Sequence, residues 1–563
     1  MGRIVGIDLG TSTSEIACIV DGTPRLLPNS QGKLITPSVV HIGEDGAVLV
    51  GEEAAEYLFT RPDCTFMEVK RLTGSYETLK AHGKEYAPEE IQAMLLNYLV
   101  RCAETSLKEK IDRAVITVPA YFTDVQRRAT TKAGELAGLT VERIINEPTA
   151  AALDYGLSNL KEIKNVLVYD LGGGTLDVTV LELFEGVIDV KASSGNNHLG
   201  GKDFDEIIMR HLTDPAGDER AIMRLKKAAE DCKIALSAHE EYEISLPFLM
   251  TSKDGKPISV EQTVSRREFE EWVSEKIEST REPMLSALSD AKLTPQDLQV
   301  ILLVGGSTRI PCVKKLVEET LGTVPRSLVD PDLTVARGAA IQAGIIEGSI
   351  NSEELVLTDV CPYTLGTAPL QEGLFGSRKV FDPLIPRNTT IPTEKARIYM
   401  TAVDYQTSVI IDVFQGESSD PENNERLGEV QLTGIPSAKQ GKEQIEVTFG
   451  YDMNGILQVK ASVVSTGTQV SAEISTTGVK AKPLLELSKW EQAEGARQFR
   501  PLIRKAEKFI ATGKDIGGDI ETLVRRIKEA LLLQNMEQAN ELREELLTMF
   551  GIMEKLEKLD KLL

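Results

Sequence analysis

The sequence has few cysteines, and their spacing is sparse. The six cysteines stand singly, and none forms a Cys-x-x-Cys pair. Zinc sites and disulfide frameworks need clustered cysteines, so neither is indicated. We expect small buried thiols in a reducing compartment.

Positive charge and long apolar runs are also scarce. The chain carries 63 basic against 86 acidic residues, a net charge of -23. Nucleic acids and anionic membranes attract clustered positive charge, so neither is an expected partner. No run approaches the roughly 20 apolar residues that span a bilayer, and the first eight residues contain no signal-peptide core. These features predict a cytoplasmic protein.

Two familiar nucleotide motifs are missing, GxxxxGK[ST] and GxGxxG. The chain instead carries one pattern twice: a strand, an aspartate, a glycine turn and a second strand. Ile4–Ser12 precedes the apolar run Ile16–Val20, and Val166–Thr175 precedes Val178–Leu183. This echo predicts two related α/β lobes, each offering one hairpin to a shared cleft.

The two turns combine groups that suit a phosphate and its cation. Glycine N–H groups form an anion-binding concavity. Aspartates beside phosphate require a hard cation such as Mg²⁺ between them. One such turn alone would be read as a tight hairpin with a solvated aspartate, whereas two favour a magnesium–nucleotide site. Hydroxyl donors accompany them at Thr11, Ser12, Thr13 and Thr175, and the carboxylates are Asp8, Asp170 and Asp177.

A third glycine turn, Val304–Arg309, follows the apolar run Ile301–Val304. A small turn beside an arginine suits a purine, because the guanidinium can stack on the ring. We expect this turn to lie against the purine ring of the nucleotide.

The length of 563 residues predicts two to four cooperative units. In the first part of the chain, strand-like and helical stretches alternate. The middle part has strands in which apolar and polar residues alternate, and the last part is helical. The boundaries that we predict are 1–349 for an α/β nucleotide-binding domain, 350–358 for a linker, 359–482 for an antiparallel β-sandwich and 483–563 for a helical lid.

Local signals support the later units. Asn454-Gly455 between alternating runs predicts a hairpin. Ser488 with Glu491 forms a capping box, and Asp519 can cap a second helix. That helix carries a one-sided apolar stripe, Leu523, Val524, Ile527 and Leu531.

Six segments in order then make a specific resemblance: Asp8–Thr11, Val118–Phe122, Asn146–Ala151, Asp170–Asp177, His198–Gly201 and Leu303–Pro311. Together they resemble the heat shock protein 70 chaperone family of the bacterial DnaK type, over residues 1–480. The resemblance implies an actin-like two-lobed ATPase domain followed by a β-sandwich and a helical lid. It implies slow ATP hydrolysis that controls binding and release of extended hydrophobic peptides.

The resemblance also assigns roles in the cleft. Lys70 would position the attacking water, and Glu147 would reach the metal through water. Asp8 and Asp170 would complete the metal shell with Asp177, and Thr175 would face the γ-phosphate. ATP or ADP and Mg²⁺ are the implied cofactors, with K⁺ as a further candidate. The implied nucleotide-binding residues are Gly10, Thr11, Ser12, Thr13, Gly172, Gly173, Thr175, Gly200, Gly201, Glu230, Lys233, Ser237, Gly305, Gly306, Ser307 and Arg309.

Further roles concern partners. Pro119 and Arg127 match a pair that relays the nucleotide state, together with Asp359. A J-domain co-chaperone would act near Arg143, Asn146, Thr149 and Asp359, and a nucleotide exchange factor is a further implied partner. Unfolded or extended polypeptides are the implied clients, and the implied peptide-binding residues are Tyr399, Ala402, Val409 and Ile411.

The chain departs from DnaK in four places. The loop Thr367–Pro383 is longer, and the segment near Thr73–Pro88 is shorter. The terminal bundle is small, which resembles the short-lid HscC branch and predicts faster client release. Thr358 replaces a usual apolar linker residue, so we expect weaker docking of the linker.

Two other functions use the same cleft. A small-molecule kinase would need an acceptor pocket with a general base, since fold does not fix function. An actin-like filament protein would sediment in a nucleotide-dependent way. Both leave residues 359–563 without a role.

Overall fold

The computed structural model describes most of the chain. The described residues are 2–157, 163–215, 218–251, 256–327, 330–351, 356–373, 376–473, 490, 495–510, 519–532, 536, 539–540, 542–544, 546–548 and 550. The chain divides into two compact units, Met1–Lys480 and Ala481–Leu563. No helix in the described part is long and apolar enough to cross a membrane.

Two sheets of matching topology form the N-terminal region. Each has three neighbouring parallel strands followed by two antiparallel ones. The first sheet, in spatial order, is β11 (Thr140–Asn146), β10 (Ile111–Val118), β1 (Arg3–Leu9), β2 (Thr13–Val20) and β3 (Thr23–Leu26), with β4 (Thr36–Pro37) also paired to β2. The second begins with β18 (Arg326–Ser327), β17 (Val300–Val304), β12 (Lys164–Leu171), β13 (Leu176–Phe184) and β14 (Val187–Asn196). The echo in the sequence therefore marks two related lobes, as predicted.

Two helices join the lobes. α4 (Glu147–Leu157) and α10 (Thr334–Glu347) pack together, and their small residues share one buried cluster with strands of both sheets. At Gly338 an added Cβ would lie 1.7 Å from the carbonyl oxygen of Ala150, so only glycine permits this approach.

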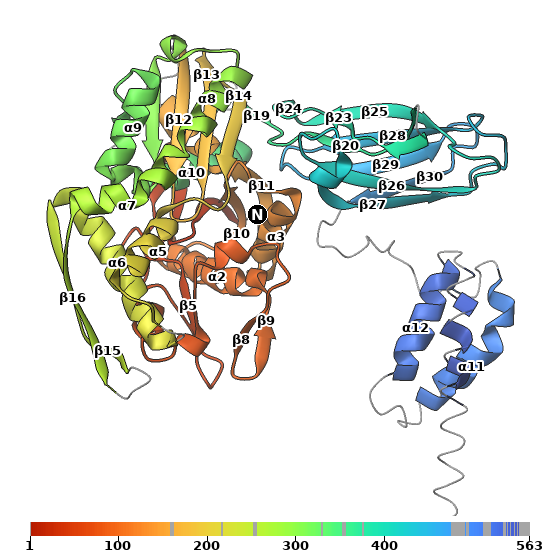
Figure 1. Ribbon diagram of the computed structural model, residues 1–563, viewed down its shortest axis with the longest axis horizontal. Coiled ribbons are helices and arrows are strands. Elements are labelled where there is room, and N and C mark those ends of the chain that lie inside the picture. Colours follow the sequence, from red (N-terminus) through yellow and green to blue (C-terminus); the bar gives the residue numbers. More distant parts are fainter. Residues whose placement is uncertain are drawn as a thin grey trace, which may run out of the picture. The chain divides into compact units, whose positions relative to one another are not determined.

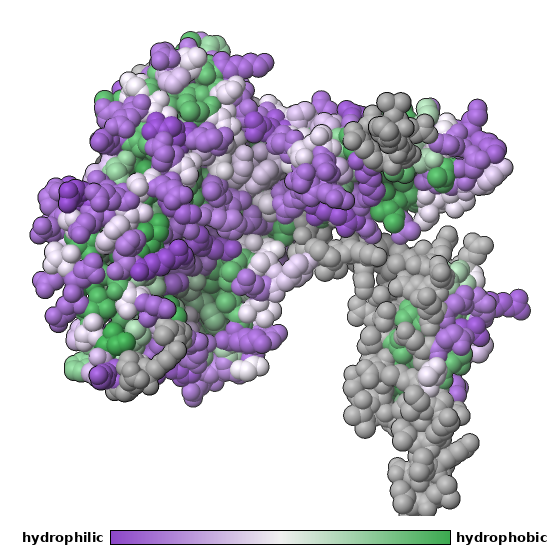
Figure 2. All heavy atoms as spheres, viewed as in Figure 1, coloured by the Kyte–Doolittle hydropathy of each residue, from purple (hydrophilic) through white to green (hydrophobic). Residues whose placement is uncertain are grey.

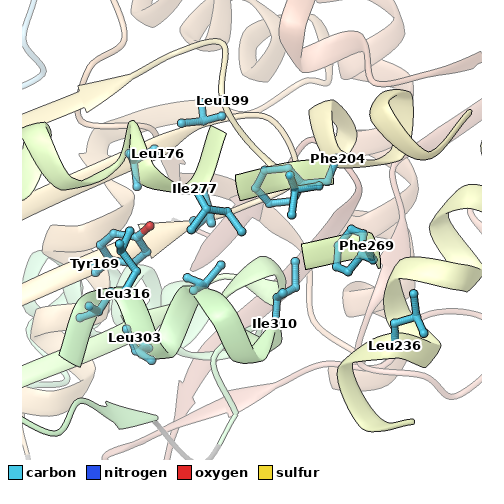
Figure 3. Packing of buried hydrophobic residues seen from close by; sticks show 14 of the residues in the cluster. Tyr169, Leu176, Leu199, Phe204, Leu236, Phe269, Ile277, Leu303, Ile310 and Leu316 are labelled. Carbon is cyan, nitrogen blue, oxygen red and sulfur yellow. The ribbon is translucent and has the colours of Figure 1, made fainter. Parts of the chain in front are cut away.

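The remaining elements of the N-terminal region lie outside the two sheets (Figure 1). Tyr169, Leu303 and Phe204 belong to the core of the second lobe, which Figure 3 shows in detail. These elements are β5 (Val39–Ile42), β6 (Val48–Val50), α1 (Glu52–Ala55), β7 (Thr65–Met67), β8 (Leu79–Ala81), β9 (Lys84–Tyr86), α2 (Pro88–Leu107), α3 (Asp124–Leu136), α5 (Gly201–Leu212), α6 (Glu219–Ala238), β15 (Glu241–Thr251), β16 (Pro257–Ser265), α7 (Arg266–Glu278), α8 (Arg281–Asp290) and α9 (Pro311–Leu321).

Two four-stranded sheets follow and enclose one apolar core. The first is β23 (Asp382–Ile385), β20 (Leu365–Thr367), β26 (Ser408–Gln415) and β27 (Glu425–Thr433); the second is β25 (Thr393–Met400), β28 (Gln444–Tyr451), β29 (Leu457–Val463) and β30 (Gln469–Glu473). β28 and β29 form the predicted hairpin, with Gly455 at φ 71°. In the longer loop, β21 (Leu370–Gly373) pairs with β22 (Gly376–Lys379).

The strand β19 (Val356–Val360) connects the two regions. Val356–Thr358 pairs in parallel with β14, and Asp359 and Val360 pair with β24 (Thr390–Ile391) of the sandwich. The Thr358 hydroxyl donates a 2.6 Å hydrogen bond to Asp189. The polar residue that we expected to weaken docking thus has a partner on β14.

The second unit contains α11 (Arg500–Ile510) and α12 (Asp519–Leu532), which pack on each other. Leu523, Val524, Ile527 and Leu531 are buried in its core, which confirms the predicted stripe. The predicted capping box of Ser488 and Glu491 lies outside the described residues, as does the side chain of Asp519.

Hydrophilic residues predominate on the face of the molecule seen in Figure 2, with apolar residues scattered between them. This agrees with a chain in which 26% of the residues are charged.

Candidate active site

A cavity of about 380 Å³ lies between the two lobes. Both predicted hairpin turns line it, together with residues of α6 and the short helix Gly306–Arg309. The predicted residues at its wall are Asp8, Gly10, Thr11, Ser12, Thr13, Lys70, Glu147, Asp170, Gly172, Gly173, Thr175, Gly201, Glu230, Lys233, Ser237, Gly305, Gly306, Ser307 and Arg309. Gly200 and Asp177, which were also predicted, are not among the residues that line the cavity.

Asp8 and Asp170 occupy equivalent places at the ends of β1 and β12. Asp8 accepts a 2.8 Å hydrogen bond from the Thr117 hydroxyl. Burial and the nearby Glu147 carboxylate raise the pKa of Asp8 to about 7, and the same two causes hold the pKa of Asp170 well above its usual range. Asp177 pairs across the hairpin with Asp170 and also has its pKa raised to about 7, mainly by burial.

Lys70 contributes the positive charge in this cluster. Its ammonium group forms a buried ion pair with Glu147, the first residue of α4. The ring of Phe122 lies 5.7 Å from the same nitrogen. Buried charges are tolerated when they are paired, so each partner fixes the orientation of the other.

The carboxylate cluster fits a hydrated cation. The charge of the Lys70 ammonium acts on Asp8, Asp170 and Asp177 and is already paired with Glu147, so the cluster favours added positive charge. Among the described residues, however, no three acidic, histidine or cysteine side chains converge closely enough to hold a metal directly. Mg²⁺ retains much of its water shell in proteins, so contact through water suits this spacing.

Two glycines of the cleft, Gly200 and Gly305, leave no room for a side chain. A Cβ added to Gly200 would lie 2.5 Å from the Gly174 nitrogen, and one on Gly305, at φ 81°, would lie 2.5 Å from the Leu171 oxygen. Ser307 donates a 2.9 Å hydrogen bond to the Gly172 carbonyl. The second and third glycine turns are therefore held together as one surface.

The opposite wall is lined by paired charges. Lys233 donates to the Gly201 carbonyl and forms an ion pair with Asp205, at 3.0 and 2.7 Å. Glu230 pairs with Lys202 at 2.8 Å. Arg309 is half-exposed and pairs with Asp332 at 2.8 Å, which holds its guanidinium at the mouth of the cavity.

Sequence reasoning missed several wall residues: Glu15, Ile35, Ile234, Val304, Ile310, Pro331, Asp332 and Val335. Glu15 had a usable signal, because it is a charged residue directly before the apolar run Ile16–Val20. It pairs with Asp8 across the first hairpin, as Asp177 pairs with Asp170 across the second. The apolar members had no such signal, since apolar residues also fill the core.

The predicted relay residues gather at the end of β19. Arg127 donates to Asn146 at 2.7 Å, and Asn146 donates to the buried Asp359 at 2.8 Å. Thr149 donates to the same carboxylate at 3.2 Å. Burial lowers the pKa of Arg143, which the Asp359 carboxylate partly offsets. Pro119 lies at the start of the loop whose carbonyls accept from Arg127.

The hairpin of the sandwich contacts the same region. Arg127 donates to the Asn454 carbonyl, and the Asn454 side chain accepts from the Ile144 amide, at 3.5 and 3.1 Å. The Leu457 amide donates a 2.6 Å bond to Asp124. The relay residues therefore lie at an interface between the nucleotide-binding region and the sandwich.

The four predicted peptide-binding residues have different surroundings. Ile411 is buried in the sandwich core, and Val409 and Tyr399 pack against that core while half-buried. The Tyr399 hydroxyl donates to Asp382 at 2.7 Å. Ala402 is half-buried in the loop after β25. Large exposed apolar residues on the sandwich are instead Leu370, Ile398, Met400, Val403, Tyr405, Ile410, Met453 and Val464.

Comparison with known proteins identifies relatives along nearly the whole chain. Residues 4–547 match the Hsp70 protein family. The chain is 44% identical over 540 residues to the chaperone protein DnaK of Mycoplasmopsis pulmonis, which covers 94% of this chain and 87% of the relative. It is 46% identical over 484 residues to the chaperone protein DnaK of Thermotoga petrophila, covering 84% and 80%.

Proposed function

The chain belongs to the Hsp70 family, and from that premise we propose that ATP hydrolysis in its cleft controls how its β-sandwich holds extended apolar peptides. The family and its DnaK relatives make it an ATP-dependent chaperone and an ATPase, and a small-molecule kinase is not favoured. The observation that carries the proposal is the cavity between two matching hairpins, with its buried carboxylates and Lys70.

The cleft residues divide the work of phosphoryl transfer to water, in which positioning and electrostatics dominate. Backbone N–H groups of the glycine turns and the hydroxyl of Thr175 bind phosphate oxygens. Lys70 holds the attacking water and offsets negative charge that develops on the phosphate. Glu147 keeps the Lys70 ammonium in place through their ion pair.

Mg²⁺ would supply neutralisation of the phosphate charge when bound with ATP. Asp8, Asp170, Asp177 and Glu147 would hold it through water, in keeping with their raised pKa values or their pairing to Lys70. K⁺ is a further candidate in the same acidic surroundings.

The opposite wall would bind adenosine. Glu230, Lys233 and Ser237 lie on one face of α6, opposite the turn that carries Arg309. The half-exposed Arg309 guanidinium suits stacking on a purine, because its pairing with Asp332 limits its movement.

Nucleotide state would reach the sandwich through the network of Arg127, Asn146, Thr149 and Asp359, with Pro119 at its start. Support comes from the position of Asp359, which is both a residue of β19 and the acceptor of two bonds from the nucleotide-binding region. The same surface, with Arg143, would receive a J-domain co-chaperone.

Unfolded or extended polypeptides would be the clients, held by main-chain hydrogen bonds and by apolar side chains entering the sandwich. Val409 and Tyr399 are half-buried beside the core, so a client side chain inserted there would complete its packing. We also propose a nucleotide exchange factor as a partner and a cytoplasmic location for the protein. The likeness to the short-lid HscC branch stays a prediction.

Isothermal titration of the full chain with ATP, with and without magnesium, tests the cleft, and ATP turnover with and without an extended apolar peptide tests the coupling. We expect magnesium-dependent ATP binding and a turnover that changes when peptide saturates the protein. Absence of magnesium-dependent adenine nucleotide binding would overturn the proposal. Binding of ATP without any peptide effect would leave an ATPase and remove the clamp.

A further inference from the structure

Tyr121 is hydrogen-bonded on both sides of its Cα atom. Its N–H donates a 3.1 Å bond to Oδ1 of Asp177. Its carbonyl oxygen accepts a 2.7 Å bond from the Tyr363 hydroxyl and a 2.6 Å bond from the Asn197 side chain. Tyr121 therefore connects a buried carboxylate of the cleft to two donors outside it.

The two donors come from different regions of the chain. Asn197 follows β14 in the nucleotide-binding region, whereas Tyr363 lies between β19 and β20 at the beginning of the sandwich. The rings of Tyr121 and Tyr363 meet edge to face, with centroids 4.9 Å apart. The hydroxyl and the ring of Tyr363 thus both contact Tyr121. Removing the hydroxyl alone therefore tests the hydrogen bond separately from the ring contact.

The loop that carries Tyr121 also reaches Lys70. The next residue, Phe122, places its ring 5.7 Å from the Lys70 ammonium. The carbonyl that Tyr363 binds belongs to the peptide unit leading to Phe122, and this unit is planar and rigid. A displacement at that carbonyl therefore acts on Phe122 directly and, across the Cα of Tyr121, on the N–H that binds Asp177.

We propose that Tyr363 is a positioning residue for ATP hydrolysis, acting through Tyr121 on Asp177 and Lys70. This inference rests on the proposed function. While the sandwich contacts the nucleotide-binding region, the Tyr363 hydroxyl holds the loop of residues 119–122. When peptide binding moves the sandwich, that donor leaves, whereas Asn197, which also lies 3.5 Å from the Tyr363 hydroxyl, keeps its bond to the Tyr121 carbonyl. The loop then changes its position rather than losing all restraint.

The decisive variant is Tyr363→Phe in the full chain, because it deletes the hydroxyl and keeps the ring. The quantity to measure is the coupling factor, the ratio of ATP turnover with and without a saturating extended apolar peptide. One hydrogen bond of ordinary strength changes an equilibrium or rate constant by a factor of about 5. We therefore expect the coupling factor of Tyr363→Phe to differ from the wild-type value by about that factor, in the direction of one. The change should appear in kcat, with the KM for ATP unchanged.

Tyr76→Phe is the matched control, because Tyr76 is an exposed tyrosine of the nucleotide-binding region. It should keep the wild-type coupling factor. As a second measurement, the ratio of peptide affinities with and without ATP should move towards one in Tyr363→Phe, because the Tyr363 hydroxyl bonds the nucleotide-binding region from the sandwich side. A purely structural role would lower thermal stability without this paired change.

A wild-type coupling factor in Tyr363→Phe overturns the inference, as does a change confined to KM. These results would leave the proposed function intact. A wild-type protein whose ATP turnover is insensitive to peptide would instead refute the coupling in the proposed function, and the role of Tyr363 with it.

Discussion

The nucleotide cleft and the β-sandwich present opposite kinds of side chain at their functional surfaces. In the cleft, Asp8, Asp170 and Lys70 are charged groups at most 9% exposed. On the sandwich, apolar residues such as Ile410 and Met400 are more than half exposed. The charged groups of the cleft are buried, as electrostatic catalysis requires, whereas the sandwich exposes apolar surface of the kind that an extended peptide can cover.

Removing the Lys70 ammonium from the carboxylate cluster should have the largest effect. Lys70→Ala leaves Glu147 buried without this ion-pair partner and removes the group that we propose faces the phosphate. We expect ATP turnover to fall by about 10²–10³-fold, the usual loss for one electrostatic contact to a transition state. Lys80→Ala, at an exposed lysine, is the control. Undiminished hydrolysis in Lys70→Ala would remove Lys70 from the mechanism.

Adjacent residues of β26 test the sandwich side of the comparison. Ile411 is 6% exposed and Ile410 is 55% exposed. Ile411→Ala should lower the free energy of unfolding of the sandwich by about 2–5 kcal/mol, because it opens a cavity. Ile410→Ala should change it by no more than about 0.5 kcal/mol. Urea unfolding of the two variants measures this difference. Equal losses of unfolding free energy in both variants would contradict the difference in burial between the two side chains.

The cleft was more predictable from the sequence than the sandwich for the same reason. Asp8 and Asp170 precede glycine turns, and a carboxylate beside a glycine turn has few structural explanations. Val409, Ile411 and Tyr399 are apolar or aromatic residues in strands, where core packing and peptide binding give the same pattern. Only the fold shows that Ile411 is buried in the core.

Contacts that depend on chain segments far apart were also beyond the sequence. Asp332, for example, enters the cavity wall through its pairing with Arg309, 23 residues earlier in the chain. Lys70 was singled out by resemblance alone, since it is one of 63 basic residues. The twin lobes, in contrast, followed from a repeated local pattern.

The cleft carboxylates should make the stability of the nucleotide-free protein depend on pH. The folded pKa values of Asp8 and Asp177 are raised to about 7, above their unfolded values of about 4. The folded state then binds the extra protons, so each group contributes stability that is complete below about pH 4 and is lost as the pH rises to about 7. Both groups therefore give the stability of the nucleotide-free protein a negative slope with pH within that window.

Thermal unfolding at several pH values between about 5 and 8 measures this slope. Asp8→Asn should flatten it, because the amide does not titrate. With magnesium and ATP bound, the ionised forms are favoured, so the stabilisation by ligand should grow as the pH rises. A nucleotide-free protein whose stability increases from pH 5 to 7 would contradict the raised pKa values.

The smallest effect is expected at the strand that joins the two regions. Thr358→Val removes the hydroxyl that donates to Asp189. We expect β19 to be held to β14 less strongly by about 1 kcal/mol, the value of one ordinary hydrogen bond. Amide hydrogen exchange of Val356–Thr358 measures this, and Thr358→Ser, which keeps the hydroxyl, is the control. Unchanged protection in Thr358→Val would show that the hydroxyl adds nothing.

The pairing of β19 has a mechanical consequence. Its first three residues pair with β14 and its last two pair with β24. A force between the two regions is therefore carried by this one short strand. Alternate residues of a strand face opposite sides, so slippage by a single position would turn Thr358 away from Asp189 and Asp359 away from Asn146 at the same time. The contacts of β19 with both regions should therefore form or break together. The connection then responds to force in a single step rather than gradually.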